Sequence, residues 1–217
     1  MITFKGDDCY FIANYSRNMV STYSFKELFQ NDITINTEVK IDWKKIEKEE
    51  HSYKGIVSFN GMHFGIMIKV DNGDYLLSAE IWTMNEEGIY VLNDCYLKLD
   101  RDTYGDWRKI KLELKQGKSI SLETTEGKRK LELNGKIPDH STSYLWIGCQ
   151  DNHRDTPEKH RGNFIGQMKS LQIDTSNGMF FDSDFKKRTR YKIFDFSGNG
   201  NHLLKSYLND DGNLIVY

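Results

Sequence analysis

The sequence predicts an all-β protein built from two packed antiparallel sheets, on three observations. Short segments alternate between apolar and polar residues, Asn-Gly or Asp-Gly pairs separate many of these segments, and only two of the 217 residues are proline. Side chains of a strand point alternately to the two faces of a sheet, so this alternation is typical of antiparallel strands with one face in the core. Asn-Gly tolerates the positive φ angles of tight hairpin turns. A single β-sandwich domain over residues 1–217 is therefore expected.

The clearest expected strand is Ile33–Ile41, in which nearly every second residue is apolar. Shorter segments with the same alternation predict strands at residues 110–114, 120–123 and 131–133. Two segments contain more apolar side chains and predict more deeply buried strands, at residues 63–70 and 75–82. The turn pairs stand at residues 60–61, 72–73, 134–135, 177–178, 199–200 and 211–212.

Helical signals are few. Residues 24–30 predict a short helix, with Ser24 as its N-cap and Glu27 three positions later. Residues 43–50 are rich in charge and predict either a helical turn or a loop. The segment 176–217 is richer in Asp, Asn and Gly, and we expect it to pack on the sandwich or to lead to a further domain.

Charge and hydropathy exclude several classes of function. The chain has 30 Lys and Arg against 32 Asp and Glu, whereas a dedicated nucleic-acid binder normally has a basic excess. Aromatic residues make up 13% of the chain, which is too many for a disordered protein. No apolar stretch has the length of a membrane span. The start lacks a secretory signal, which indicates a cytoplasmic location for the chain as written, and an extracellular or cell-surface one if it is a fragment.

Cysteine is sparse and widely spaced, which excludes a disulfide-rich scaffold. Cys9, Cys95 and Cys149 form no C-x-x-C pair. We expect three buried free thiols, with one disulfide as the alternative.

Seven short motifs stand in order along nearly the whole chain. They are F-K-G-D-D-C-Y at 4–10, I-T-I-N-T-E-V-K-I at 33–41, W-R-K-I-K-L at 107–112, L-N-G-K at 133–136, L-W-I-G at 145–148, F-I-G-Q-M-K-S-L-Q-I at 164–173 and D-F-S-G-N-G-N-H at 195–202. Together they resemble the motifs of laminin-G-like, pentraxin-like and concanavalin A-like domains. The resemblance implies a concanavalin A-like jelly roll, a sandwich of two antiparallel sheets. It also implies carbohydrate binding, often with Ca²⁺, although other members bind proteins and some related folds are glycan hydrolases or lyases.

The most polar connection, residues 150–163, joins two expected core strands. Long polar loops in compact sandwiches commonly carry binding residues. Arg offers paired N–H groups to a carboxylate or phosphate, and Asp and Asn accept hydrogen bonds from sugar hydroxyls. The ligand-binding candidates are Asp151, Asn152, His153, Arg154, Asp155, His160 and Arg161. Two alternatives stay open, namely a metal site made by Asp151, His153 and His160, and a solvated hairpin tip without a ligand.

A second candidate site follows from alternate oxygen-bearing residues near the C-terminal end. Asp195, Ser197, Asn199 and Asn201 surround Gly200, and short oxygen side chains around a sharp glycine bend suit a Ca²⁺ loop. The alternative is a turn held by side-chain hydrogen bonds.

Each tryptophan either stacks on a sugar ring as an exposed aromatic platform or packs in the hydrophobic core. Trp107 and Trp146 stand at expected core positions, whereas Trp82 is the candidate sugar platform.

The sequence contains no E-x-D-x-x-E strand, nucleophile elbow or phosphate-binding glycine loop. Together with the resemblance, these absences favour a non-catalytic carbohydrate-binding module, either on its own or as the accessory domain of a larger glycan-handling protein. The expected partner is an oligo- or polysaccharide, and neither nucleic acid nor a membrane. A protein-interaction or assembly module is the alternative, and a glycan lyase or hydrolase with an atypical site is the third.

Overall fold

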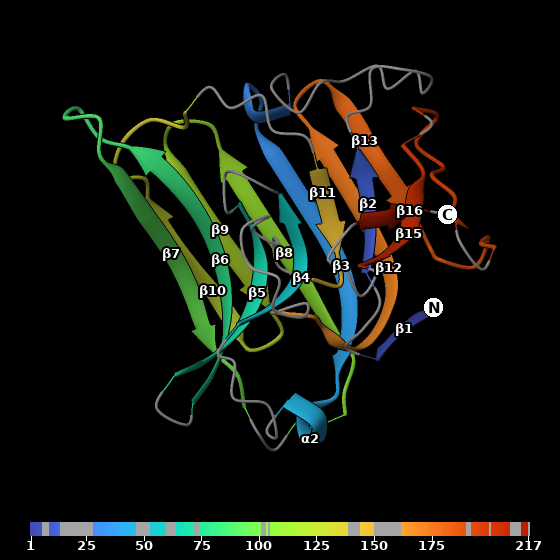
Figure 1. Ribbon diagram of the computed structural model, residues 1–217. Coiled ribbons are helices and arrows are strands. Elements are labelled where there is room, and N and C mark those ends of the chain that lie inside the picture. Colours follow the sequence, from blue (N-terminus) through green and yellow to red (C-terminus); the bar gives the residue numbers. More distant parts are fainter. Residues whose placement is uncertain are drawn as a thin grey trace.

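The computed structural model shows two antiparallel β-sheets packed face to face (Figure 1). Both chain termini lie on the same side of the molecule in this view. The structure describes residues 1–5, 9–13, 28–46, 53–59, 64–71, 74–100, 103, 105–138, 144–149, 162–189, 192–199, 201–208 and 214–216.

Seven strands form one sheet and nine form the other, and all pairings between these strands are antiparallel. Across the seven-stranded sheet the order is β1 (Ile2–Lys5), β12 (Ile165–Thr175), β3 (Ile33–Ile41), β8 (Arg108–Lys115), β9 (Ser119–Thr124) and β10 (Gly127–Glu132), with β13 (Gly178–Ser183) also paired to β12. Across the nine-stranded sheet it is β14 (Lys192–Ile193), β15 (Leu203–Leu208), β2 (Cys9–Ala13), β11 (Tyr144–Ile147), β4 (Tyr53–Phe59), β5 (Phe64–Asp71), β6 (Asp74–Met84) and β7 (Tyr90–Lys98), with β16 (Leu214–Val216) paired to β15.

The strands expected from alternation are confirmed, except that the segment 131–133 contributes only its first two residues, at the end of β10. β3 alternates strictly between buried and partly exposed residues along its nine positions, and β8 and β9 contain the expected segments 110–114 and 120–123. The two apolar segments form β5 and β6, in which most residues are buried. The residues after Thr175 add β13 to one sheet and β14, β15 and β16 to the other.

Helical structure is short. Of the two alternatives expected for residues 43–50, a helical turn or a loop, the structure shows a helical turn, α2 (Trp43–Ile46). The helix expected at 24–30 is described only from Leu28, where two residues are helical, and its proposed cap lies outside the described residues. Within the described ranges, no helix is long and apolar enough to cross a membrane.

Apolar side chains from both inner faces fill the space between the sheets. Phe4 meets Phe164 edge to face, with ring centroids 5.6 Å apart. Phe29 packs in the same way on Phe59 and Phe64, at 5.3 and 5.4 Å. Such edge-to-face pairs add to the stabilisation that burial alone provides.

The expected packing role is confirmed for Trp146, which is buried, whereas Trp107 meets it only in part. Leu145 and Ile147 of β11 belong to the core, so Trp146 between them is buried on the opposite face of the sheet. Trp107 precedes β8 and is only half-buried, with the Lys169 ammonium 4.1 Å from its ring centroid. Alternation places a side chain on a face, but it does not reveal which face is the core.

Two of the three cysteines are described at side-chain level. Cys95 and Cys149 are buried free thiols, as predicted for them. Burial raises the pKa of the Cys95 thiol, which keeps this group protonated and unreactive. The side chain of Cys9 lies outside the described residues.

Gly148 lies directly against a core side chain. Its φ is +85°, and a Cβ atom there would lie 2.2 Å from Cε1 of Phe4. Gly148→Ala is therefore expected to lower the free energy of unfolding by about 3 kcal/mol, from left-handed backbone strain plus overpacking. Urea denaturation measures this loss. Gly117→Ala is the matched control, because Gly117 has φ +64° but nothing within 4 Å. Equal losses in the two variants would contradict the role of Phe4.

Candidate functional site on the nine-stranded sheet

The outer face of the nine-stranded sheet, the side away from the core, contains buried charges and partly exposed aromatic side chains. On β6, Ala79 and Ile81 belong to the core. Glu80 and Trp82 alternate with them and therefore point to the outer face. Glu80 is 4% exposed and Trp82 is half-buried.

A charged cluster, defined as Lys69, Glu80 and Asp94, lies on this face. The Lys69 ammonium pairs with the Glu80 carboxylate and lies 2.5 Å from Oδ2 of Asp94. Glu80 and Asp94 stand directly opposite each other on β6 and β7. Ser78 donates a hydrogen bond from its hydroxyl to Oδ1 of Asp94.

Mutual pairing explains how these charges stay in a buried position. An unpaired buried charge is strongly destabilising, whereas here one amine faces two carboxylates. The side chains of Lys69 and Glu80 are 9% and 5% exposed, and that of Asp94 is 27% exposed. Asp94 is therefore the member most accessible from solvent, and the cluster has one net negative charge.

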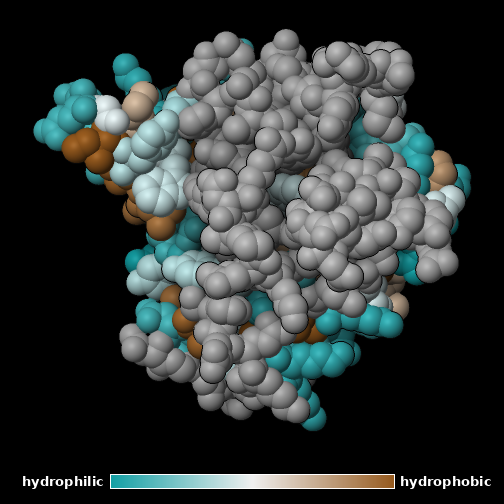
Figure 2. All heavy atoms as spheres, viewed as in Figure 1, coloured by the Kyte–Doolittle hydropathy of each residue, from teal (hydrophilic) through white to brown (hydrophobic). Residues whose placement is uncertain are grey.

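An apolar strip runs beside the charged cluster along β6 and β7. Trp82 stands opposite Leu92, and Met84 stands opposite Tyr90. Leu92 is 40% exposed and Tyr90 is 49% exposed. Tyr96, farther along β7, is 38% exposed with the Arg129 guanidinium 4.8 Å from its ring centroid. Figure 2 shows brown and pale side chains gathered at the left of the molecule, where Figure 1 places the ends of β6 and β7.

The structure thus places one sequence-predicted residue, Trp82, beside a charged cluster that the sequence analysis missed. A usable signal existed, because Lys69 and Glu80 are single charges inside the apolar segments F-G-I-M-I-K-V and L-L-S-A-E-I-W. The polar-loop candidates lie outside the described residues and stay predictions; they are Asp151, Asn152, His153, Arg154, Asp155, His160 and Arg161.

The second candidate, the turn at Asp195, is held by hydrogen bonds to its carboxylate. Oδ1 accepts from the backbone N–H groups of Asp182 and Ser197, at 3.0 and 2.9 Å. Oδ2 accepts from the Ser197 hydroxyl at 2.7 Å and from the Asn201 N–H at 2.9 Å. Four donors therefore surround this carboxylate, as in a turn fixed by its own side chain.

The two asparagines of this turn present donors to the backbone. Asn199 donates from Nδ2 to the Met179 carbonyl at 2.5 Å, and Asn201 to the Phe180 carbonyl at 2.8 Å. Asn201 also has a buried Oδ1 atom that accepts no hydrogen bond from any described residue. Among the described residues, no group of three or more His, Cys, Asp or Glu is arranged to hold a metal ion. Binding of Ca²⁺ by Asp195 would require some of these hydrogen bonds to break. A Ca²⁺ site made by Asp195, Ser197, Asn199 and Asn201 stays a prediction.

Comparison with known proteins gives likenesses of fold only. No family model matches the chain, and no curated protein matches it. Solved structures of similar fold include a pentraxin from Limulus polyphemus, 12% identical, covering 77% of this chain and 76% of its own with a TM-score of 0.40. The receptor binding domain of botulinum neurotoxin C/D mosaic serotype is 13% identical over 80% of this chain, with a TM-score of 0.45, and this chain spans 40% of its length. An alginate lyase from Pseudomonas aeruginosa is 11% identical over 69% and 67% of the two chains, with a TM-score of 0.39.

The all-β class with two packed antiparallel sheets, expected from alternation and from the seven motifs, is confirmed by the order of the strands. Identities of 11 to 13% do not transfer a ligand, so the site has to be interpreted from its own residues.

The hydrogen bonds at Asp195 predict how the protein responds to Ca²⁺. We expect equal melting temperatures in excess Ca²⁺ and in EDTA, because both oxygens of Asp195 already accept two hydrogen bonds each. Differential scanning calorimetry measures this comparison. A melting temperature that rises with Ca²⁺ in the wild type but not in Asp195→Asn would instead establish the calcium site.

Asp182 predicts a pH-dependent effect beside the same turn. Burial, and then repulsion from Asp195 and Asp174, raises the pKa of Asp182 in the folded state. The ionised form is thus disfavoured by folding, so stability falls as the pH rises from the unfolded pKa through the folded pKa. Asp182→Asn should raise the melting temperature at pH 7, and the gain should vanish below the unfolded value of 3.8. Asp184→Asn is the control and should lower the melting temperature at pH 7. A hydrogen bond from the Lys186 N–H lowers the pKa of Asp184, so folding favours its ionised form. A gain that persists at low pH would contradict the electrostatic cause.

Proposed function

We propose that the protein is a non-catalytic carbohydrate-binding module that holds its glycan on the outer face of the nine-stranded sheet. The observation that carries the proposal is the position of Trp82, partly exposed and two residues from Glu80 on the same strand. An aromatic ring beside carboxylate acceptors suits a sugar ring, which has an apolar face and hydroxyl donors.

The chemistry of a pyranose explains this match. Its C–H face is apolar and packs on an indole ring, while its hydroxyls need acceptors and donors at the edge. Trp82 supplies the ring and Leu92 extends the apolar surface. Asp94 supplies carboxylate oxygens that already accept from Ser78 and Lys69, so they are held in place before a ligand arrives.

Binding is favoured over hydrolysis by the pairing of the charged cluster. A glycosidase needs one carboxyl group that gives a proton to the leaving oxygen and a second that acts on the sugar. Here Glu80 and Asp94 are both engaged by the same Lys69. A lyase or hydrolase with an atypical site is therefore the less favoured proposal.

A protein partner is the second candidate, and the apolar strip favours it. Tyr90, Leu92 and Tyr96 are all more than one third exposed, and exposed aromatic side chains are enriched in protein interfaces. In that case the chain would serve as an interaction or accessory domain of a larger glycan-handling protein.

A glycan array, followed by calorimetric titration of the best ligand, tests the proposal. Trp82→Ala and Asp94→Asn should each weaken binding at least about tenfold, since loss of a stacking platform or a charge-assisted hydrogen bond costs roughly 1.5 kcal/mol. Phe196→Ala is the matched control because Phe196 is an aromatic side chain that is 43% exposed at another position, and its affinity should not change.

An array without any bound glycan, with folded protein confirmed by circular dichroism, would reject the carbohydrate proposal in favour of a protein partner. Equal affinities of Trp82→Ala and the wild type would place the glycan elsewhere. Release of products from a bound polysaccharide would establish an enzyme instead.

A further inference from the structure

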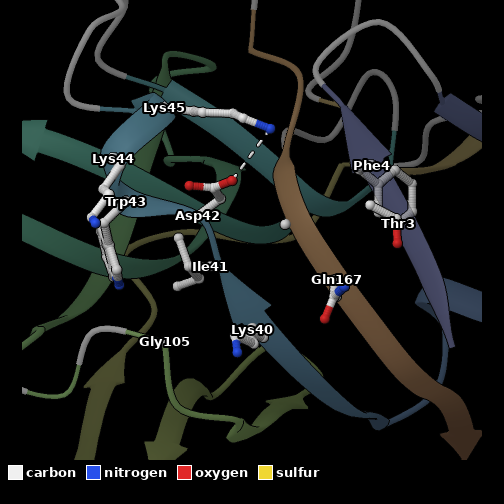
Figure 3. A pocket seen from close by; sticks show the side chains of 11 residues that line it. Thr3, Phe4, Lys40, Ile41, Asp42, Trp43, Lys44, Lys45, Gly105 and Gln167 are labelled. Atoms are coloured by element: carbon white, nitrogen blue, oxygen red, sulfur yellow. Dashed lines mark ion pairs between the residues drawn. The ribbon is translucent and has the colours of Figure 1, made fainter.

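Two of the hollows on the seven-stranded sheet differ in what lines them. The one beside α2 contains the Asp42–Lys45 ion pair, but its apolar lining of Phe4, Ile41 and Trp43 is at most 3% exposed and belongs to the core (Figure 3). The other hollow has a volume of about 360 Å³ and lies across β13, β12, β3, β8 and β9. Its volume falls in the range typical of small-molecule sites.

A row of directly opposed residues crosses the second hollow. Asp182 of β13 stands opposite Gln172 of β12, and Gln172 stands opposite Asn36 of β3. Asn36 in turn stands opposite Lys111 of β8. Ile173, next to Gln172, belongs to the core, so the row points to the outer face of the sheet. These side chains therefore line one space together, which we call the polar hollow.

Three consecutive members of the row have hydrogen-bonding atoms without a partner. Among the described residues, the side chains of Asn36 and Asp182 make no hydrogen bond and no ion pair. Gln172 uses only its amide nitrogen, which donates to Oδ1 of Asp174 at 3.5 Å. The polar hollow thus offers a ligand one carboxylate, one complete amide group and one amide oxygen.

The β8 and β9 side of the polar hollow contains paired charges. Lys111 pairs with Glu113 at 3.0 Å, and Glu123, opposite Lys111, pairs with Lys128 at 2.8 Å. Lys109 has no ion pair among the described residues, but it is exposed and stands on β8, three strands from β13. Since neighbouring strands lie about 4.8 Å apart, roughly 14 Å separates Lys109 from β13, which is too far for an ion pair.

Asp182 is by contrast an acid without a cation. Burial raises the pKa of its carboxyl group, and so does repulsion from Asp195, Asp174 and Asp184. The carboxylate is thus held at a position where the fold itself disfavours its charge, and acids perturbed in this way are concentrated in functional sites. An ammonium group of a ligand would supply the missing opposite charge.

The amides indicate the rest of the ligand. The oxygens of Asn36 and Gln172 accept hydrogen bonds from hydroxyl groups, and the amide nitrogen of Asn36 donates to them. None of the described residues that line the polar hollow is aromatic, so it has no platform for an apolar ring face. A hydroxyl-rich amine fits these groups, whereas an aromatic or aliphatic amine would leave the amides unpaired.

We propose that the polar hollow binds an amino sugar through its ammonium group. Asp182 accepts a charge-assisted hydrogen bond from the ammonium, and Asn36 and Gln172 form hydrogen bonds with hydroxyls of the same ring. The polar hollow lies on the other sheet from Trp82, so the inference does not rest on the glycan surface proposed above.

Titration of the full chain with four probes at equal ionic strength tests the site. The probes are glucosamine, glucose, N-acetylglucosamine and methylammonium chloride. We expect glucosamine to cause saturable shifts of the backbone amide signals of Asp182 and Gln172 in two-dimensional NMR spectra. It should bind at least about tenfold more tightly than glucose or N-acetylglucosamine, which lack the charge, and at least about threefold more tightly than methylammonium, which lacks the hydroxyls.

A variant that removes one charge locates the binding. Asp182→Asn keeps the shape of the side chain and should weaken the affinity for glucosamine by at least about tenfold. The same variant is expected to melt at a higher temperature at pH 7, so its loss of affinity would not come from unfolding. Asp106→Asn is the matched control, because Asp106 is an exposed aspartate outside the polar hollow. Its affinity should change less than about twofold, as expected of a screened surface charge.

Trp82→Ala separates the polar hollow from the surface on the nine-stranded sheet, and it should bind glucosamine as tightly as the wild type does. Loss of glucosamine binding in Trp82→Ala would place the amino sugar on that other sheet and overturn the proposal. Absence of saturable shifts at Asp182, equal affinities for glucosamine and N-acetylglucosamine, or equal affinities of Asp182→Asn and Asp106→Asn would also overturn it. Methylammonium that binds as tightly as glucosamine would overturn the role of the amides and with it the choice of an amino sugar.

Discussion

Every strand has to place one face in the single apolar layer between the sheets, and this constraint decides where all other side chains lie. In β3 the constraint is simple, because the outer face meets water and the residues alternate. In β5 and β6 most positions on both faces are buried. A charge on the outer face of these strands therefore needs a partner, and the neighbouring strand provides it. Lys69, Glu80 and Asp94 come together for that reason.

The two outer faces consequently have different chemistry. On the seven-stranded sheet, lysines and carboxylates pair near the solvent, as in Lys115–Asp32 and Lys128–Glu123. On the nine-stranded sheet, Lys69, Glu80 and Asp94 form a largely buried charged cluster, and the half-buried Trp82 lies on the same face.

The alternation of apolar and polar residues was sufficient to predict the strands, but it was not sufficient to predict the candidate site on the nine-stranded sheet. The period of Ile33–Ile41 reports the burial of its residues directly, so the strand could be predicted from that segment alone. The same period places Trp146 on a defined face but cannot distinguish an inner face from a buried outer one. The pairing of Glu80 with Asp94 depends on the register between β6 and β7, which is set by packing of the whole hairpin. The turn at Asp195 shows a second limit of sequence patterns. The same spacing of polar residues is compatible with a bound cation and with a carboxylate that accepts hydrogen bonds from backbone N–H groups.

The order of strands also has a consequence for how the chain acquires its structure. β1 pairs with β12, and β2 pairs with β15, so the first strands join partners that come more than 150 residues later. Contacts between such distant segments form slowly, because a long loop has to close before any pairing is gained. During synthesis, β2 has no partner on its β15 side until residue 208 has emerged. If translation pauses before β15 is made, the nascent chain therefore exposes the unpaired edge of β2. Such unpaired edges promote association between incomplete chains.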